Sequence, residues 1–394
     1  MPRSLLLAPA LLSLIACGNA GNGTAGATPA PSATASPTPT PAPTPVADLP
    51  AGLPFNASLE GHFDNPFAIA FLPDGRLLVT EKPGHLKLRA TDGSVADVTG
   101  VPATAQVGQG GLLDVAIAPD FASSHAIYLS YSEPGSGGSS LALARATLDT
   151  STSRPKLDGL KVIWHQMPKG DGGQFGAVIA FSPDHQHLFL ASGERQRFTP
   201  AQDPDQALGK ILRFNLDGSV PKDNPMASQG GARAITWSTG HRNPYGLVFA
   251  ADGRLWENEM GPKGGDELNL IEPGKNYGWP NVSWGDNYDG TPIPKPKAGD
   301  GYQMPALYWV PSISPGGSII YTGSMFPEWD GNYIMGALSG QALVRIELSG
   351  ATAKKANQWD MGMRIRDVAQ SPDGAIWLIQ DGDNGQLMRL TPKS

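Results

Sequence analysis

Three arginines have a spacing that suits the binding of an anionic ligand. Arg364 and Arg366 are two residues apart, so in a β-strand both side chains lie on one face. Arg242 offers a third guanidinium from a distant part of the chain. Planar guanidinium groups bind carboxylates through paired N–H donors, so three of them around one cavity predict a ligand that carries carboxylates. The alternative is a structural role, in which these arginines pair with Asp367 or Glu267.

Five loops combine glycine or proline with polar side chains, and they contain these arginines. They span residues 108–114, 170–176, 240–244, 259–267 and 363–367. Each loop by itself can be explained as a structural turn as well as by a functional site. They indicate a site only if the fold brings them together. Oxygen ligands for calcium are offered by Asp171, Asp266, Glu267, Asp286 and Asp289. Residues 286–290 lack the full calcium-loop pattern and are expected to form a turn.

One short pattern recurs along the body of the chain and predicts a strand, a tight turn and a second strand. Its copies centre on Asp74, Asp120, Asp184, Asp252 and Asp373. Asp-Gly pairs supply the positive φ that a two-residue hairpin turn requires. The copies lie about 45 to 70 residues apart, with one double gap in which residues 318–322 fit a degenerate member.

Six four-stranded blades of this size account for residues 49–394, so the sequence predicts an all-β, six-bladed β-propeller. The alternative fold is an irregular pair of β-sandwiches. In a propeller, loops from several blades meet at one mouth of the central channel. The residues of a site are therefore expected to be scattered along the chain.

The composition agrees with such a fold and excludes several classes of protein. The 394 residues include 49 Gly and 37 Pro, which rules out a coiled coil or a helical bundle. Hydrophobic residues make up 40% and charged residues 16%, so the chain can bury a sizeable core. The formal net charge is −7 and no segment gathers Lys and Arg, so nucleic acid is not an expected partner.

The first segment, residues 1–17, has the layout of a bacterial secretory signal. Arg3 precedes an apolar run over residues 5–15, which is too short to span a bilayer as a helix. Residues 14–17 resemble a lipobox, the signal at which bacterial lipoproteins are cut and acylated on the new N-terminal cysteine. Cys17 is the only cysteine, which favours a lipid anchor over an ordinary signal peptide.

Residues 18–48 consist almost entirely of Ala, Thr, Pro, Gly and Ser, so they are expected to form a disordered, extended tether. The protein is then expected at the periplasmic side of the bacterial cell envelope. Its only contact with the membrane would be the lipid on Cys17.

The loops described above, in this order, resemble those of the soluble glucose/sorbosone dehydrogenase family. These quinoprotein aldose sugar dehydrogenases use pyrroloquinoline quinone and calcium. The similarity runs from about Leu59 to Leu390, and members of the family are six-bladed propellers. Its most specific stretches are Gln109-Gly110-Gly111-Leu112-Leu113, His241-Arg242-Asn243-Pro244, Gly261-Pro262 with Asp266-Glu267-Leu268-Asn269, Asn276-Tyr277-Gly278-Trp279-Pro280 and Arg364-Ile365-Arg366-Asp367-Val368.

The resemblance implies a set of roles for the residues of this chain. The quinone would be contacted by Gln109, Arg242 and Asn243, and its carboxylates would be held by Arg364 and Arg366. The backbone carbonyls of Gly261 and Pro262 would coordinate calcium. The implied reaction moves a hydride from the C1 hydroxyl of an aldose to the quinone and yields the lactone. The electrons would leave to an external acceptor, either a separate protein or a membrane quinone, because the chain has no haem-attachment motif.

The sequence departs from the family at two cofactor-pocket positions. Gln174 takes the place of the histidine that serves the family as base, and a neutral amide cannot accept the proton. Ser339 takes the place of a lysine in the cofactor pocket. Either Glu194, at the position of a carboxylate that supports the histidine, or Asp171 could take the proton instead. Besides these two candidate bases, a third explanation is that sugar oxidation has been altered or lost while the quinone site persists.

Two further functions compete with the dehydrogenase. One is a calcium-dependent lactone hydrolase on the same kind of propeller, which would have little use for three arginines. The other is a non-catalytic propeller that binds a saccharide or a protein at the cell surface, which the missing histidine favours.

Overall fold

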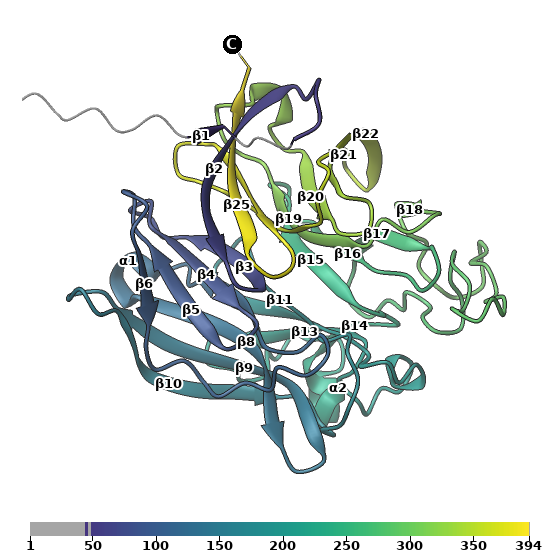
Figure 1. Ribbon diagram of the computed structural model, residues 1–394. Coiled ribbons are helices and arrows are strands. Elements are labelled where there is room, and N and C mark those ends of the chain that lie inside the picture. The colour runs from purple at the N-terminus through teal and green to yellow at the C-terminus, as the bar shows by residue number, and fades with distance from the viewer. Residues whose placement is uncertain (1–43, 46–48, 394) are drawn as a thin grey trace, which may run out of the picture. The chain divides into compact units, whose positions relative to one another are not determined.

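The computed structural model describes residues 44–45 and 49–393, which fold into six blades arranged as a ring (Figure 1). Each blade is an antiparallel sheet of four strands, to which the short strand β1 adds a fifth in one blade, so the predicted six-bladed β-propeller is confirmed. The expected signal, residues 1–17, lies outside the described residues. The same is true of the expected tether, residues 18–48, apart from the strand β1 (Thr44–Pro45).

Strands follow one another from the channel outward within each of the first five blades. Blade 1 contains β3 (Pro66–Phe71), β4 (Leu77–Glu81), β5 (His85–Arg89) and β6 (Val95–Val98). Blade 2 contains β7 (Leu112–Ile117), β8 (Ala126–Gly135), β9 (Gly138–Asp149) and β10 (Lys156–His165). Blade 3 contains β11 (Gly176–Phe181), β12 (His187–Ser192), β13 (Lys210–Asn215) and β14 (Thr236–Thr239). Blade 4 contains β15 (Pro244–Phe249), β16 (Leu255–Glu259), β17 (Asp266–Ile271) and β18 (Leu307–Trp309). Blade 5 contains β19 (Pro315–Ile320), β20 (Tyr333–Ala337), β21 (Ala342–Ser349) and β22 (Thr352–Asp360).

The sixth blade closes the ring by joining the two ends of the domain. Its inner strands are β23 (Ile365–Gln370), β24 (Ile376–Gln380) and β25 (Gly385–Pro392), and its fourth strand is β2 (Phe55–Phe63). Figure 1 shows β2 in purple lying along β25 in yellow, with β1 at the outer edge of β2. Because the first and last strands share one sheet, the hydrogen bonds of that sheet hold the ring closed.

Short helices occupy connections between strands. They are α1 (Phe121–Ser124), α2 (Gly231–Ile235), η1 (Thr199–Ala201), η2 (Ala227–Gln229) and η3 (Pro327–Trp329). Within the described residues, no helix is long and apolar enough to cross a membrane.

The recurring sequence pattern forms the hairpin between the first and second strands of a blade. In blade 1, Gly75 has φ 86° and the carboxylate of Asp74 accepts the backbone N–H of Arg76 at 3.1 Å. Blade 4 repeats this arrangement with an identical distance, from Arg254 to Asp252. The expected two-residue turn is wrong, because five residues, 72–76, separate β3 from β4. The bond from the N–H of residue 72 to the carbonyl of residue 76, at 2.8 Å, closes this longer loop.

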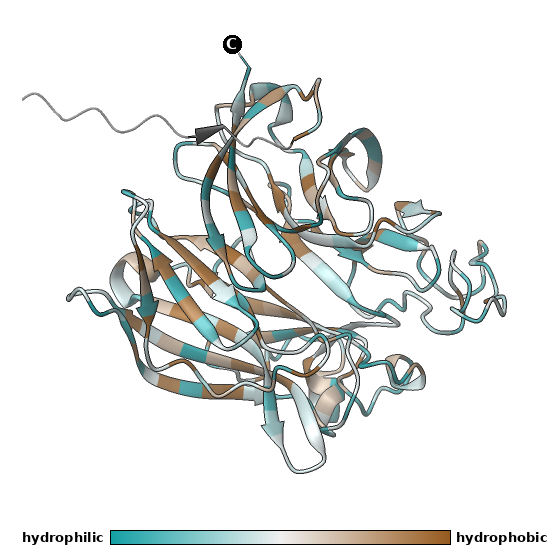
Figure 2. Ribbon diagram, viewed as in Figure 1, coloured by the Kyte–Doolittle hydropathy of each residue, from teal (hydrophilic) through white to brown (hydrophobic). Residues whose placement is uncertain are grey.

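The blades pack against one another through aliphatic and aromatic side chains, as the brown bands along the strands in Figure 2 indicate. Their innermost strands surround a cavity of about 350 Å³. Each inner strand contributes to its wall, for example through Phe67, Asp114, Ile179, Leu247, Ser318 and Asp367. This cavity is the channel that the repeat pattern predicted.

Every inner strand carries a β-bulge near its beginning. The register with the second strand shifts between residues 66 and 69, 112 and 115, 176 and 179, 244 and 246, 315 and 318, and 365 and 367. Bulges re-aim side chains and end regular pairing. Since the blades are repeats around one axis, all six bulges lie towards the same mouth of the channel, where they free the preceding loops to carry a site.

Candidate functional site

The predicted site residues lie at the starts of inner strands, on the mouth just described. Gln109 precedes β7, Gln174 precedes β11, Arg242 and Asn243 precede β15, and Arg364 precedes β23. Neighbouring inner strands contact one another around the ring. Residues that are far apart in the sequence therefore meet at one end of the channel.

Gln174 bridges a carboxylate and a guanidinium at this mouth. With its amide nitrogen facing Glu194, that nitrogen donates to Glu194 Oε1, and its amide oxygen accepts from Arg242 Nη2 at 2.8 Å. All three residues are buried, with exposed fractions of 5% for Gln174, 1% for Glu194 and 6% for Arg242. The structure thus brings together two of the candidate catalytic residues and one of the three predicted arginines.

Glu194 is held by its own loop. Its carboxylate accepts backbone N–H groups from Gln196 at 3.1 Å and Arg197 at 2.6 Å, and also from Phe198. The loop can present three N–H groups to one side chain because Arg195, Gln196 and Phe198 all have positive φ, between 57° and 63°. Burial raises the pKa of Glu194 above its ordinary value, although these backbone bonds and the charge of Arg242 oppose the shift.

Gln109 and Asn243 hold the backbone on either side of Gln174. Gln109 Oε1 accepts the N–H of Gln174 at 2.6 Å, and Asn243 Oδ1 accepts the N–H of Gly176 at 3.2 Å. Gln174 itself has φ 52°, a conformation that costs energy for a residue with a side chain. The two amides therefore stabilise an unusual backbone at the centre of the site.

Arg242 reaches from the Gln174 side of the mouth to the expected calcium loop. Its Nη1 donates to the carbonyl oxygens of Met260 at 3.0 Å and Gly261 at 2.8 Å. Its guanidinium lies 5.2 Å from the ring centroid of Trp279, a cation–π contact. Its Nε is buried and has no partner among the described residues, so this guanidinium has a donor that a ligand could use.

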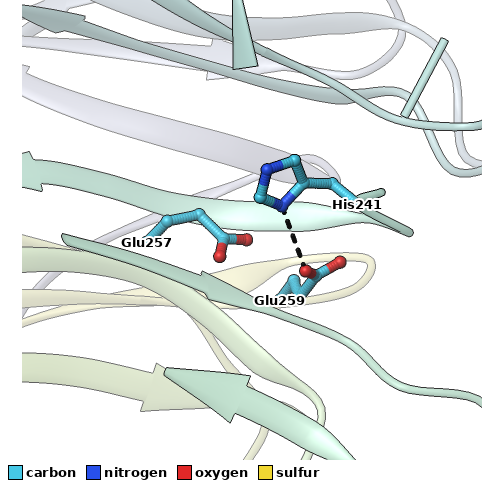
Figure 3. A group of neighbouring side chains, drawn as sticks. All are labelled: His241, Glu257 and Glu259. Carbon is cyan, nitrogen blue, oxygen red and sulfur yellow. Dashed lines mark hydrogen bonds and ion pairs between the residues drawn. The ribbon is translucent and has the colours of Figure 1, made fainter. Parts of the chain in front are cut away.

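His241, Glu257 and Glu259 form a buried group (Figure 3), and one of them binds the backbone of Arg242. Glu259 Oε2 accepts the N–H of Arg242 at 2.5 Å and that of Asn243 at 3.2 Å, while Glu259 Oε1 lies 3.2 Å from His241 Nδ1. Glu257 lies beside them, and ligand atoms of the two glutamates and His241 are within 4.8 Å of one another. Burial, and then the charge of Glu259, raise the pKa of Glu257 well above its ordinary value. The group anchors the loop whose side chain enters the mouth.

The expected calcium loop offers oxygen atoms beside the carboxyl groups of Glu257 and Glu259. The carbonyl of Gly261 points at Arg242, and Asp266 Oδ1 accepts the N–H of Gly261 at 2.9 Å. A cavity of about 10 Å³, the size of one water or ion, is lined by Arg242, Glu259, Gly261 and Glu267. Carbonyl and carboxylate oxygens are the ligands that calcium prefers, so the donor set fits such an ion.

Arg364 and Arg366 share one carboxylate, Asp381, which sequence reasoning did not identify. Their Nε atoms donate to Asp381 Oδ2 and Oδ1, each at 2.9 Å, and Arg366 Nη2 donates to Oδ1 at 2.6 Å. Burial alone would raise the pKa of Asp381, but the charges of Arg366 and Arg364 and their hydrogen bonds lower it below its ordinary value. The expected alternative pairing with Asp367 is not found, because that carboxylate accepts the N–H groups of residues 69 and 368.

The two arginines also lie close to the blade of Arg242. The guanidinium of Arg366 is 5.4 Å from the ring centroid of Tyr245, which follows Arg242 by three residues on the same loop and strand. Arg366 lines the channel, whereas the side chain of Arg364 is 47% exposed at its rim. The three arginines are therefore on one mouth. Of the four Nη atoms of Arg364 and Arg366, only Arg366 Nη2 has a hydrogen-bond partner among the described residues.

The remaining predicted residues occupy the edge of this region. Asp171 is exposed on the loop before Gln174, and no hydrogen bond joins its side chain to Gln174 or Arg242 in the described part of the chain. Ser339 is exposed in blade 5, where its hydroxyl lies 2.8 Å from that of Ser314. Ser314 in turn donates its N–H to Asp266 at 2.7 Å, so Ser339 borders the expected calcium loop.

Arg195 is a second residue that the sequence did not single out. Its side chain is buried and donates to the carbonyl oxygens of Gly173 at 3.0 Å and Gly172 at 2.9 Å, and its guanidinium lies 3.7 Å from the ring centroid of Phe175. Its own N–H donates to the carbonyl of Gln174 at 3.2 Å. Burial lowers the pKa of Arg195 to about 10. The only local signal was its place next to Glu194, because its partners come from a separate loop.

Comparison with known proteins places this chain among sugar dehydrogenases. The profile of the family described as Glucose / Sorbosone dehydrogenase matches residues 63–389. The aldose sugar dehydrogenase YliI of Escherichia coli (strain K12) is 39% identical over 347 residues, which cover 85% of this chain and 92% of that protein.

Solved structures agree with the sequence comparison. The soluble aldose sugar dehydrogenase of Escherichia coli in its apo form superimposes with a TM-score of 0.81 at 38% identity, over 86% of this chain and all of that one. The PQQ-bound aldose sugar dehydrogenase of Streptomyces coelicolor superimposes with a TM-score of 0.71 at 28% identity, over 88% of this chain and 100% of that one.

Proposed function

Because this chain belongs to the glucose/sorbosone dehydrogenase family, we propose that it is an aldose dehydrogenase that uses pyrroloquinoline quinone and calcium. The substrate is an aldose, and the reaction removes the C1 hydrogen as hydride and the hydroxyl proton, yielding the lactone. Its relatives support this proposal, since one is an aldose sugar dehydrogenase by name and another is a PQQ-bound form of such an enzyme.

One observation carries the proposal for this chain. Residues from four different blades, Gln109, Gln174, Arg242 and Arg366, converge on one mouth of the channel. In residues 44–45 and 49–393, the buried Nε of Arg242 and the Nη atoms of Arg364 have no hydrogen-bond partner, so the mouth offers donors to a ligand. A planar ligand with several carboxylates fits these forked donors, and a lactone hydrolase would leave them unused.

The residues of the chain have distinct tasks once the cofactor is bound. The quinone supplies the hydride acceptor. Arg364 and Arg366 hold its carboxylates, and the carbonyls of Gly261 and Pro262 help to hold calcium. Arg242 would supply a fixed positive charge to the bound quinone, which would favour the build-up of negative charge on it. The short distances from Arg242 to the Met260 and Gly261 carbonyls keep this guanidinium in place.

We assign the proton from the sugar hydroxyl to Glu194, with Gln174 orienting that hydroxyl. The carboxylate of Glu194 accepts a hydrogen bond from the amide of Gln174, and its raised pKa makes it a better base at neutral pH than an ordinary glutamate. Gln174 keeps one N–H and one lone pair beyond its bonds to Glu194 and Arg242. Three backbone N–H groups already share the Glu194 oxygens, so a slow reaction is expected.

Reconstitution tests the proposal. Apo-protein mixed with pyrroloquinoline quinone and calcium should develop the visible spectrum of the bound quinone, and added aldose should then reduce an artificial electron acceptor. A spectrum without turnover for any aldose would select the non-catalytic account. The absence of any spectral change would refute the quinone site itself.

Two variants separate the candidate bases. Glu194→Gln should abolish turnover of the reconstituted protein, while Asp171→Asn should leave it within about twofold, because Asp171 lies exposed and outside the cluster. If Asp171→Asn loses turnover and Glu194→Gln keeps it, Asp171 and not Glu194 is the base. Quinone binding measured in both variants distinguishes a lost base from a lost pocket.

We propose further that the protein is lipid-anchored through Cys17 at the periplasmic side of the cell envelope and passes electrons to a separate acceptor. The position of the sole cysteine at the end of the apolar run supports this. Labelling of cells with a fatty acid should mark the wild-type protein and not Cys17→Ser. Equal release of both proteins from membranes would contradict the anchor.

A further inference from the structure

Lys82 occupies a place at the mouth that neither its sequence nor the family resemblance pointed to. It directly follows β4 in the turn to β5, and it lies between the starts of two blades. Its N–H donates to the carbonyl of Asn65, before β3, at 3.0 Å, and its carbonyl accepts the N–H of Leu112, at the start of β7, at 3.2 Å. The backbone of Lys82 is therefore held on the mouth by both neighbours.

One glycine of the Gln109 loop is explained by this contact. A Cβ on Gly111 would lie 2.3 Å from the carbonyl oxygen of Lys82, and Gly111 has φ 146°. Only glycine allows the loop to approach so closely. Lys82 is thus packed against the loop that carries the candidate quinone ligand Gln109.

On its other side, Lys82 faces the segment that holds the paired arginines. Asn65, which accepts its N–H, donates from its own side chain to Asp383 at 2.5 Å and from its backbone to the carbonyl of Gly382 at 3.2 Å. The N–H of Asp381 donates to the carbonyl of Arg364 at 2.9 Å. Asn65 therefore connects Lys82 with residues 382 and 383, which directly follow the carboxylate shared by Arg364 and Arg366.

The ammonium group of Lys82 has no committed partner. In the described part of the chain, its Nζ makes no ion pair and no side-chain hydrogen bond, and the side chain is half-buried. Asp381 is already engaged by three bonds from Arg364 and Arg366. Burial, and then the charges of Arg366 and Arg364, lower the pKa of Lys82 below its ordinary value. Asp381 and Asp383 oppose this shift, but two carboxylates do not balance three cations, so an anionic ligand would reduce the repulsion.

We propose that Lys82 is a cofactor-binding residue, which supplies the third cation that holds the quinone carboxylates together with Arg364 and Arg366. The inference rests on the proposed quinone site and extends it. It also accounts for Ser339, which occurs where the family resemblance implies a lysine. The positive charge missing from blade 5 is provided from blade 1, on the other side of blade 6.

The test compares quinone affinity in variants of equal net charge. Apo-protein in calcium buffer is titrated with pyrroloquinoline quinone while the quenching of tryptophan fluorescence is followed. Lys82→Gln should raise the Kd about tenfold, the usual size of one lost charge-assisted hydrogen bond at a partly exposed site, and Lys82→Arg should stay within about threefold. Lys354→Gln is the matched control. Lys354 is 80% exposed on the outer strand β22, and its substitution removes the same charge.

Salt dependence and apo-protein stability provide readouts that do not need turnover. The dependence of log Kd on log salt should be shallower in Lys82→Gln than in Lys354→Gln, since one fewer cation meets the ligand. The melting temperature of apo Lys82→Gln should equal or exceed that of the wild type, because the substitution relieves repulsion. A marked fall would show a structural role and overturn the proposal.

The outcomes separate the two levels of inference. If wild-type protein binds the quinone and Lys82→Gln binds it equally well with the same salt dependence, Lys82 has no such role and the quinone site stands. If wild-type protein does not bind the quinone, the proposed function fails, and the assignment of Lys82 fails with it. If Lys82→Gln does not fold, Lys82 has a structural role and the proposal is overturned.

Discussion

Replacing Gln174 by histidine should restore a base at the centre of the site. The backbone can accept the change, because Gln174 has φ 52° and histidine is among the residues that adopt this region most readily. One ring nitrogen would take the place of the amide nitrogen against Glu194 Oε1, and the carboxylate would orient the ring. The other nitrogen would face the mouth.

The size of the effect follows from what the amide cannot do. A positioned general base contributes about 10²–10⁴ in rate, which corresponds to roughly 3–5 kcal/mol in the activation free energy. We therefore expect kcat for aldose oxidation to rise by about two orders of magnitude or more in Gln174→His. Quinone affinity should change less than about threefold, because Arg364 and Arg366 are untouched.

The assay is aldose-dependent reduction of an artificial acceptor by protein reconstituted with quinone and calcium, measured from pH 5 to 9. Activity should gain an inflection near pH 6–7, the range in which a histidine loses its proton. Gln174→Met is the matched control, since it fills similar volume without a base. Adding Glu194→Gln to Gln174→His should remove most of the gain. A variant that binds quinone normally and shows neither faster turnover nor the new inflection would refute this account of the site.

Three further predictions test the ligand-binding groups and the channel. Arg364→Ala should weaken quinone binding about tenfold or more, by titration of fluorescence, whereas Arg389→Ala, on the outer part of blade 6 and paired with Asp373, should not; equal affinity would remove Arg364 from the pocket. Removing calcium with a chelator should lower quinone affinity, and adding calcium back should restore it, because the Gly261 and Pro262 carbonyls need a cation to hold an anionic ligand. Unchanged affinity would argue against the calcium site. Burial raises the pKa of Asp367 to about 8, so the folded protein keeps a proton that the unfolded chain has lost, and stability should fall as pH rises from about 4 to 8. Asp367→Asn should remove up to about 1.4 kcal/mol per pH unit of this dependence in urea unfolding measured at successive pH values, and parallel profiles would contradict the raised pKa.

The blade architecture was accessible from the sequence because its signals are local. An aspartate three residues before the next strand and a glycine with positive φ define a turn by themselves, as at Asp74 and Gly75. Five recurring turns and one degenerate copy were enough to count the blades. The length of the turn was predicted wrongly, because an Asp-Gly pair occurs both in a two-residue turn and in the five-residue loop found here.

The site was only partly accessible for the same reason. The two-residue spacing of Arg364 and Arg366 predicted that they act together, and the structure shows them sharing Asp381. Nothing in the sequence marked Asp381, which lies 15 residues further on in another strand connection, as their partner. The expected partner Asp367 was nearer in sequence but points into the channel and is used by the backbone of a neighbouring blade.

The amino-acid sequence by itself determined how many blades form and which loops carry polar groups, because turn chemistry and strand spacing act over a few residues. Tertiary structure alone decided which of those groups meet. Gln174 lies between Glu194 and Arg242, and Lys82 lies beside the paired arginines, only because closure of the ring brings the ends of separate inner strands together. Contacts between distant segments depend on that closure, and no local pattern encodes them.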